Sequence, residues 1–422
     1  KESFNNNEQE TLIFNEDEII IDINEELELI ENLIKQHTIM TDKFDITVTN
    51  PPYMGNSRMN GILKEYIDKN YSDVKSDLFA VFFIKCGEIT KRKGYLGFMS
   101  PFVWMFIKSY EELRKIFIEG KTISSLVQLE YSGFEDATVP ICTFVLQNSY
   151  TDKKGEYIKL SDFKGAKNQP IKTLEAVKNP NCNWRFQAKQ KDFEKIPGSP
   201  IAYWVSKKML KTFTEGIILK DLGILREGVK TGNNELYIYY WTEICYKDFY
   251  KKDKDYNKKW FPHHKGGEFR KWYGNNLEVI FWENDGEEIK KLKNSGISGK
   301  EMYFKPILSW SKTSSSHFGI RFYRDQLFDS ASPAIMLYNT NTLKYVLAFL
   351  TSLGEKYLTF INPSMSTQVG DIGILPLLIT ENLEVVENIN NLVQQNIDIS
   401  KEEWDSRETS WDFEKLSLID SK

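Results

Sequence analysis

The stretch FDITVTNPPYMGNS, residues 44–57, decides how the rest of the sequence is interpreted. Its first six residues are rich in aromatic and β-branched side chains and predict a buried strand at 44–49. That strand runs directly into the tetrapeptide NPPY at 50–53, here called the NPPY corner. Two consecutive prolines cannot donate backbone hydrogen bonds or continue a helix, so the strand must end in a rigid turn that lacks donors.

Helical and strand patterns alternate around this stretch and define a first region at residues 1–150. Such alternation predicts an α/β fold with a mostly parallel sheet, whose last strand pair forms an antiparallel edge. The expected order is a strand at 44–49, a helix near 76–91, a strand at 94–101, a helix at 109–120, and strands at 123–129 and 141–147.

Two further regions follow in the sequence. Residues 165–378 contain many short strand-like runs, abundant Gly, Asn and Lys, and seven tryptophans, which predicts an α+β domain with long surface loops. Residues 379–422 predict a helical tail. Ser400 and Glu403 have the spacing of a capping box, so a second short helix is expected to begin there.

The charge of the 422-residue chain is unevenly distributed. The net charge is −5, but residues 1–42 carry −10 and residues 381–422 carry −7, which leaves +12 on residues 43–380. The densest basic segment, 246–272, holds nine Lys or Arg against four acids, with aromatic residues between them. Such a segment could neutralise phosphates and stack on bases, although it could equally be a solvated loop.

Several classes of protein are disfavoured by the composition. The chain has no 18-residue apolar run and no signal-peptide pattern, so a cytoplasmic protein without membrane contact is expected. Its four cysteines are widely spaced and include no CxxC, which argues against a disulfide framework or a zinc site. The four histidines form no HExxH motif, and no metal site is predicted.

The residue types of the NPPY corner suit one kind of ligand. In open α/β sheets, ligands bind outside the carboxyl ends of the strands, where this corner is expected to lie. The Asn50 side chain and the carbonyl groups of the Pro51–Pro52 turn are acceptors, and Tyr53 offers a flat face. Two acceptors could bind both N–H donors of an exocyclic amino group, favour a pyramidal nitrogen and localise its lone pair for attack on a methyl group.

The NPPY corner resembles motif IV of amino-directed DNA methyltransferases, and VTNPPYMGN resembles the adenine-N6 form of that motif. The resemblance implies the C-terminal half of a Rossmann-like class I methyltransferase sheet. It makes Asn50, Pro51, Pro52 and Tyr53 catalytic, with a flipped adenine stacked on Tyr53. In FEDATVPICTFVL, Phe134 is the expected second base-stacking residue.

Five further segments extend the resemblance to essentially the whole chain, which looks like the BREX phage-defence adenine methyltransferases of the PglX type. The implied activity is site-specific DNA adenine-N6 methylation that marks self DNA. Double-stranded DNA is the implied partner, with other BREX proteins or a phage DNA-mimic inhibitor as further ones. The segments are REGVKTGNNELYI (226–238), GGEFRKWYGNNLEVIFWENDG (266–286), YFKPILSWSK (303–312), INPSMSTQVGDIGILPL (361–377) and SKEEWDSRETSWDF (400–413).

In this family, the middle region is the target-recognition domain. Glycines allow close backbone approach to DNA, and side-chain amides can read adenine edges. The resemblance therefore places DNA contacts in the loop GVKTGNN and in the turn QVGDI, although a tight turn and a strand end are alternative roles for these two segments. The residues concerned are Gly228, Thr231, Gly232, Asn233, Asn234, Gln368, Gly370 and Asp371.

The cofactor of the family is S-adenosyl-L-methionine, which Asn50 and Pro52 are also expected to contact. Its main binding element, a Gly-rich loop after the first strand, has no match here. The first glycine is Gly55, already past the NPPY corner, and no two glycines are separated by one residue. We therefore expect the chain to be an internal piece of a larger enzyme that does not methylate DNA alone.

Two alternatives remain open from the sequence. A restriction–modification fusion of the type IIG kind needs a nuclease site, and Asp285, Glu288 and Lys290 supply the residue types. The aspartate lies only three residues before the glutamate, however, which fits an exposed charged helix start better. The second alternative is a non-catalytic DNA-recognition or assembly module that retains the corner without turnover.

Overall fold

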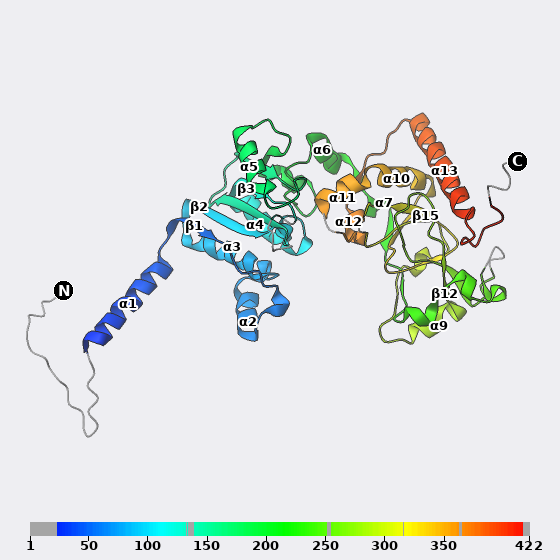
Figure 1. Cartoon of the computed structure of the whole chain (residues 1–422), viewed down its shortest axis with the longest axis horizontal. Coiled ribbons are helices and arrows are strands. Elements are labelled where there is room, and N and C mark those ends of the chain that lie inside the picture. Colours follow the sequence, from blue (N-terminus) through cyan, green and yellow to red (C-terminus); the bar gives the residue numbers. More distant parts are fainter. Residues whose placement is uncertain are drawn as a thin grey trace, which may run out of the picture.

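The computed structural model describes residues 23–131, 133, 139–250, 255–314, 316–362 and 365–416. These residues form a mixed α/β structure with two lobes side by side, and helix α1 (Ile23–Thr41) projects from the first (Figure 1). The first lobe spans residues 44–195 and the second spans residues 206–416. The ten residues between them, 196–205, are here called the connecting segment. No helix among the described residues is long and apolar enough to cross a membrane.

The first lobe is built on a six-stranded sheet. Its strand order is β1-β2-β4-β3-β5-β6, in which the pairs β1–β2 and β3–β5 are parallel and the other pairs are antiparallel. The strands are β1 Phe44–Thr49, β2 Thr90–Pro101, β3 Thr122–Gln128, β4 Ile141–Gln147, β5 Lys154–Lys159 and β6 Arg185–Lys189. The four strands that the sequence predicts are thus present, and β3 and β4 form the predicted antiparallel pair. The prediction of a mostly parallel sheet with this pair at its edge is wrong, because three of the five pairings are antiparallel and β5 and β6 continue the sheet beyond β3.

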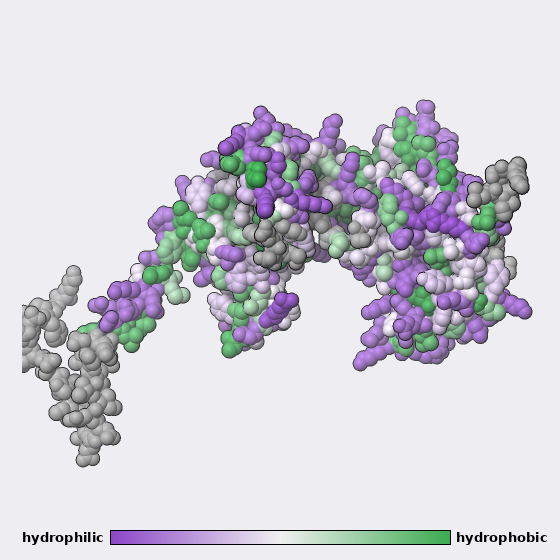
Figure 2. Space-filling model, viewed as in Figure 1, coloured by the Kyte–Doolittle hydropathy of each residue, from purple (hydrophilic) through white to green (hydrophobic). Residues whose placement is uncertain are grey.

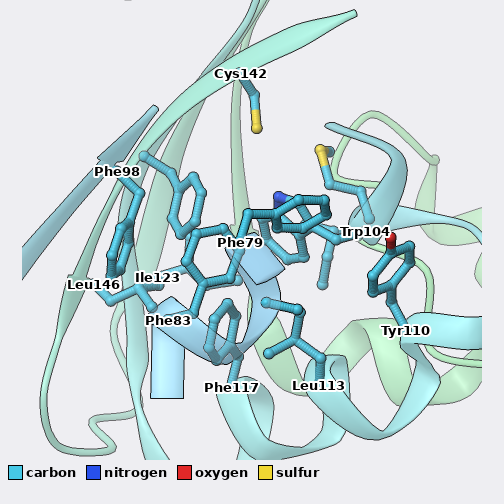
Figure 3. Close-up of a cluster of buried hydrophobic side chains, with 14 of the residues drawn as sticks. Phe79, Phe83, Phe98, Trp104, Tyr110, Leu113, Phe117, Ile123, Cys142 and Leu146 are labelled. Atoms are coloured by element: carbon cyan, nitrogen blue, oxygen red, sulfur yellow. The ribbon is translucent and has the colours of Figure 1, made fainter. Parts of the chain in front are cut away.

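Aromatic side chains fill the space between this sheet and its covering helices α3 (Leu78–Ile89) and α4 (Glu111–Gly120) (Figure 3). Phe83 lies at the centre of the cluster and is fully buried. Its ring centroid is 4.6 Å from that of Phe98 and 5.3 Å from that of Phe144. Helix α3 has this apolar face because its apolar residues recur at helical spacing. Helices α2 (Gly61–Asn70) and α5 (Asn168–Lys178) complete the first lobe.

Strand β1 is an edge strand with an open outer side, so the prediction of a buried strand at 44–49 is wrong as to burial: none of its six residues is buried. It pairs only with β2 among the described strands, and the side chains of Ile46 and Val48 are 65% and 73% exposed. Figure 2 shows hydrophobic surface along α1 and around this edge. Apolar, unpaired edges of this kind are normally covered in native proteins. The sheet is therefore suited to receive further structure beside β1.

The first sheet continues past residue 150, where the first region was expected to end. Strands β5 and β6 extend it, and residues as far along as Phe193, Ile201 and Tyr203 belong to the first aromatic core. The sequence of β5, KGEYIK, is mostly polar and charged, so it gives little indication of a sheet strand. Pairing with β3 and burial of Tyr157 establish it instead.

The buried guanidinium of Arg114, a residue of α4, holds the connecting segment against that helix. It donates to the carbonyl oxygens of Trp104 (2.8 Å), Ile107 (2.8 Å) and Gly198 (2.6 Å). Burial lowers the pKa of Arg114 to about 10, which still leaves it charged at neutral pH. The connecting segment then contributes to both cores, with Ile201 in the first and Ala202 in the second.

The second lobe contains two four-stranded sheets, as the expected α+β pattern requires. Their orders are β10-β12-β11-β16 and β15-β14-β17-β8. The first sheet comprises β10 Ile238–Tyr240, β12 Glu278–Phe281, β11 Trp260–His264 and β16 Leu327–Phe328. The second comprises β15 Ile320–Tyr323, β14 Ile307–Trp310, β17 Ala334–Leu337 and β8 Gly223–Arg226. Two short pairs are added, β13 (Gly296–Ile297) with β9 (Val229–Lys230) and β18 (Pro376–Leu377) with β7 (Ile217–Ile218).

Short helices connect these strands, and one long helix closes the lobe (Figure 1). The long helix α13 (Leu383–Asp405) places Val393 and Ile397 in the second core. The prediction of a separate helix beginning at Ser400 is wrong, because α13 runs through that residue without interruption. The short helices are α6 Lys207–Glu215, α7 Leu219–Leu222, α8 Asn234–Tyr237, α9 Glu283–Lys290, α10 Leu343–Phe349, α11 Glu355–Ile361 and α12 Val369–Gly373.

The central position of Phe83 gives a test of the first core. Truncation to Ala removes a buried ring from the aromatic cluster, so Phe83→Ala should lower the free energy of unfolding by about 3–5 kcal/mol. Urea denaturation of the 422-residue chain, followed by circular dichroism, measures this loss. The matched control is Phe44→Ala on the open edge strand, with an expected change below about 1 kcal/mol. Equal losses for the two variants would contradict the assigned core.

Candidate active site

The NPPY corner lies where the carboxyl ends of two parallel strands meet. Thr49, the last residue of β1, is in register with Phe98 of β2, so Asn50 lies beside the end of β2. Pro51 is buried beneath the corner, whereas Asn50 and Pro52 are exposed. The exposed amide therefore projects from a backbone that Pro51 fixes, at the sheet edge where α/β proteins bind ligands.

Tyr53 completes the corner and contacts Asn50 directly. The Tyr53 hydroxyl donates a hydrogen bond of 2.8 Å to Asn50 Oδ1 and lies 3.4 Å from the carbonyl oxygen of Met99. Its ring meets the edge of Phe79 at 6.3 Å between centroids and is 38% exposed. Burial, followed by the nearby Cys142, raises the pKa of Tyr53, so the phenol remains a donor at neutral pH.

Asp77 fixes the backbone that follows the corner, and the sequence reasoning missed it. One carboxylate oxygen of Asp77 accepts from the amide N–H of Met54 at 2.9 Å and from that of Phe79 at 3.2 Å. The second contact makes Asp77 the N-cap of α3. An aspartate directly before an apolar helical run is a recognisable cap signal, so the helix start was detectable. Its bond to Met54 was not, because it joins segments 23 residues apart.

The floor of the corner holds a buried cysteine. Cys142 lies on β4 with its sulfur 3.9 Å from the hydroxyl of Ser100, and both residues are fully buried. Burial raises the pKa of the Cys142 thiol to about 12. The thiol is therefore neutral near pH 7 and poorly suited to act as a nucleophile. The expected second base-stacking residue, Phe134, lies outside the described residues.

The predicted DNA-contacting loop of the second lobe presents some of its residues and buries others. Thr231 is 1% exposed, and its hydroxyl donates to Asn234 Oδ1 at 2.5 Å. Gly232 adopts a positive φ of 76°, a conformation that favours glycine. Gly228 passes so close to the carbonyl of Phe328 that a side chain could not fit. Asn233 and Asn234 are both exposed, and Asn234 Oδ1 is the acceptor of the Thr231 bond, so the Asn233 side chain is the amide more readily offered to a ligand.

The QVGDI turn forms the start of helix α12. Asp371 accepts from the backbone N–H of Gln368 at 2.7 Å and from the Asn362 side chain at 2.8 Å, so its carboxylate caps the helix. The Gln368 side chain donates to the hydroxyl of Ser366 at 2.6 Å, and Gln368 itself is exposed. Gly370 is also exposed. The Asp371 carboxylate thus stabilises the start of α12, while Gln368 and Gly370 are exposed to solvent.

The acidic residues of the alternative nuclease site are used elsewhere. Asp285 forms ion pairs with Lys290 (3.4 Å) and with Lys300. Glu288 lies on the same short helix and pairs with Lys291 at 3.0 Å. Within the described residues, no three His, Cys, Asp or Glu side chains are grouped as metal ligands. These contacts favour the exposed charged helix start over a nuclease centre.

The described residues fit S-adenosylmethionine only in part. Asn50 and Pro52 are exposed at the carboxyl end of β1, the edge from which a cofactor could be reached. The open side of β1, with its exposed Ile46 and Val48, has no described Gly-rich loop beside it. A complete cofactor site therefore needs residues in addition to those of this lobe.

Asp77 offers a test of how the corner is held. Asp77→Ala removes both hydrogen bonds and the helix cap, so the free energy of unfolding should fall by about 1–2 kcal/mol. Thermal and urea unfolding measure the loss, and Asp73→Ala, an exposed aspartate on the neighbouring turn, serves as the control. Burial raises the pKa of Asp77, which means that ionisation opposes folding. The loss should therefore be smaller above that pKa than below it; an unchanged stability would contradict the pinning role.

Comparison with known proteins adds to this geometry. Residues 1–134 match the Eco57I restriction-modification methylase family. The adenine-specific methyltransferase PglX of Lacticaseibacillus casei (strain Zhang) is 36% identical, over 94% of this chain and 34% of that protein. The adenine-specific methyltransferase BrxX of Escherichia coli O9:H4 (strain HS) is 34% identical, over 92% of this chain and 32% of that protein.

A solved structure shares the fold at low sequence identity. The type IIL restriction-modification enzyme MmeI, determined in complex with DNA, superposes with a TM-score of 0.56 at 13% identity. The match covers 85% of this chain and 49% of MmeI. This chain spans about one third of the length of its curated relatives. Over most of its length it is homologous to part of the adenine-specific methyltransferases PglX and BrxX.

Proposed function

We propose that this chain forms the adenine-binding and DNA-reading part of a site-specific DNA adenine-N6 methyltransferase. The observation that carries the proposal is the Asn50 amide, which is exposed at the carboxyl ends of two parallel strands beside the face of Tyr53. The relatedness to PglX and BrxX, whose names specify adenine methylation, supports it. The first lobe then corresponds to the C-terminal half of a Rossmann-like class I methyltransferase sheet.

The corner acts on an adenine that has left the DNA stack. Flipping costs a few kcal/mol, and stacking of the base on Tyr53 offsets about 1–3 kcal/mol of it. The adenine amino group displaces the Tyr53 hydroxyl from Asn50 Oδ1 and donates its second N–H to a carbonyl oxygen of the Pro51–Pro52 turn. These two bonds favour a pyramidal nitrogen whose lone pair is available to the methyl group, and the surplus proton leaves to water.

S-adenosylmethionine, when bound, supplies the electrophilic methyl group. From this chain, Asn50 and Pro52 contact it at the end of β1. The open edge of β1 supports the addition of further strands from the remaining length of such a protein, which would carry the Gly-rich loop. The 422-residue chain alone is accordingly inactive in methyl transfer.

The second lobe reads the DNA. Its segment 246–272 carries nine Lys or Arg against four acids, and this local excess of positive charge suits a phosphate backbone. Asn233, Gln368 and Gly370 present exposed polar or backbone groups, whereas Thr231 and Asp371 hold the two segments in shape. MmeI, which shares the fold, was determined in complex with DNA. We place the activity in the cytoplasm, where it marks self DNA within a BREX phage-defence system. Its further partners are other BREX proteins or a phage DNA-mimic inhibitor.

A second candidate is a restriction–modification enzyme, which the Eco57I and MmeI similarities favour. A non-catalytic DNA-recognition module is the third. Supplying the remaining length of the protein separates them: recovery of methyl transfer excludes the module, and DNA cleavage by the same preparation identifies the restriction enzyme.

The roles of Asn50 and Tyr53 can be separated in the complete protein. Asn50→Ala should abolish methyl transfer because the amino group loses its acceptor, while duplex DNA affinity changes little. Tyr53→Phe keeps the stacking face and should retain most transfer, whereas Tyr53→Ala should lose about tenfold or more. Transfer of labelled methyl groups to duplex DNA measures activity, and Asn56→Ala just beyond the corner is the control. Full activity of Asn50→Ala would refute the proposed role.

The reading role of the second lobe has its own test. Asn233→Ala should change which sequences are methylated, because it alters an exposed amide without disturbing the loop. The buried Thr231→Val should instead lower stability, since it breaks the bond to Asn234. Long-read methylome sequencing and thermal unfolding distinguish the two outcomes. An identical methylome for Asn233→Ala would contradict the proposal that the loop reads bases.

A further inference from the structure

A cavity of about 360 Å³ lies in the second lobe between its strands and helix α13. One wall comes from Tyr273, Asn276, Tyr323 and Gln326, and the other from α13 and the residues that follow it, including Trp411. Figure 1 shows α13 beside the strand region that contains β15. Its volume falls within the range of about 300–1,000 Å³ that is common for small-molecule sites. The NPPY corner belongs to the other lobe, so the cavity is separate from the methylation site.

The cavity is rich in flat aromatic side chains whose positions are fixed. Tyr323 is buried, and its hydroxyl donates to the carbonyl oxygen of Gly274 at 2.6 Å. The ring of Tyr250 stacks on that of Phe261 with 4.9 Å between centroids. Phe249 packs against Trp411 at 5.9 Å. Because neighbours already hold these rings, a planar ligand could stack on them without a large loss of side-chain entropy.

Two amide side chains in the wall carry acceptor oxygens without a partner among the described residues. These are Asn276 Oδ1 and Gln326 Oε1, on residues that are only 2% and 4% exposed. The Asn276 side chain is hydrogen-bonded to Tyr273, but Asn276 Oδ1 takes no part in a hydrogen bond among the described residues. Buried polar atoms are nearly always paired in native proteins, and each exception calls for an explanation. A ligand with N–H donors supplies one for both oxygens.

The charged groups at the cavity limit the charge of its ligand. Asp325, Asp398 and Asp412 face Arg324 and Lys401 across the lining. Lys401 forms ion pairs with Asp405 and, at 3.8 Å, with Asp412, and Asp398 accepts from Gln394. With carboxylates in the majority, a phosphate or another anion would be repelled. The charge pattern therefore favours a neutral ligand.

We propose that this cavity binds a neutral planar heteroaromatic ring with amino or ring N–H donors, the chemistry of a nucleobase. Its faces stack on the aromatic walls, and its donors pair with the Asn276 and Gln326 oxygens. The ring comes either from a free base or nucleoside or from a base of bound DNA whose phosphates stay outside the cavity. In both cases the cavity is a second base-binding site, distinct from the one at Asn50.

Isothermal titration calorimetry with adenine tests the free-ligand source on the 422-residue chain. We expect an adenine site whose affinity is about tenfold or more weaker in Gln326→Leu, which loses the acceptor but keeps the volume. The matched control is Asn390→Leu, because Asn390 Oδ1 is also buried without a described partner but lies outside the lining. Adenine should bind this variant as it binds the parent chain. Thermal unfolding verifies that each variant is folded.

The second arm measures duplex DNA affinity for the same variants. If the ring comes from DNA, Gln326→Leu weakens duplex binding and Asn390→Leu does not. Trp411 is a half-buried residue of the lining, and Trp411→Leu provides an independent variant. It should weaken the same interaction, with adenine or with duplex DNA, that Gln326→Leu weakens. The proposal is overturned if both adenine and duplex bind Gln326→Leu and Trp411→Leu as they bind the parent chain. Methyl transfer by the complete protein tests the role of Asn50 separately from these binding measurements, so failure here and failure of the methylation proposal remain distinguishable.

Discussion

The carboxylate of Asp77 is the contact on which the corner depends. A turn built from two prolines has few backbone donors and cannot hold itself in place through a ladder. Asp77 supplies the anchor from outside, since it accepts from Met54 just after the corner and from Phe79 at the start of α3. The same side chain therefore starts the helix that carries Phe79 and Phe83 into the aromatic core. One carboxylate therefore stabilises both the backbone after the NPPY corner and the start of the helix that forms the aromatic core.

The bond between Tyr53 and Asn50 shows how the corner is organised without a ligand. The phenol supplies the O–H donor that an amide oxygen at the surface would otherwise obtain from water. An incoming amino group exchanges one donor for another, so the amide does not need to turn. Under the proposed function, a prearranged acceptor of this kind lowers the reorganisation needed for methyl transfer. The Tyr53 ring, which is 38% exposed, is also held in place, because it makes a T-shaped contact with Phe79.

The sequence predicted this lobe best where residue types have few alternative uses. The strands at 44–49 and 141–147 match β1 and β4, and the chemistry of NPPY singled out Asn50 and Tyr53. Features set by contacts between distant segments were missed. The strand β5 is polar and exists because β3 pairs with it, and Asp77 reaches Met54 only in the folded chain. The burial of Thr231 belongs to this class, since a threonine in a Gly- and Asn-rich loop looks accessible in the sequence.

The connecting segment has a consequence for how the two lobes can move and be exchanged. Alternate residues of it enter different cores, with Ile201 and Tyr203 in the first and Ala202 in the second, and Arg114 holds it at Gly198. A hinge at this point would have to break two hydrophobic cores at once. A chimaera that exchanges the second lobe should be joined downstream of residue 205, since a junction near residue 150 would cut the first sheet in two.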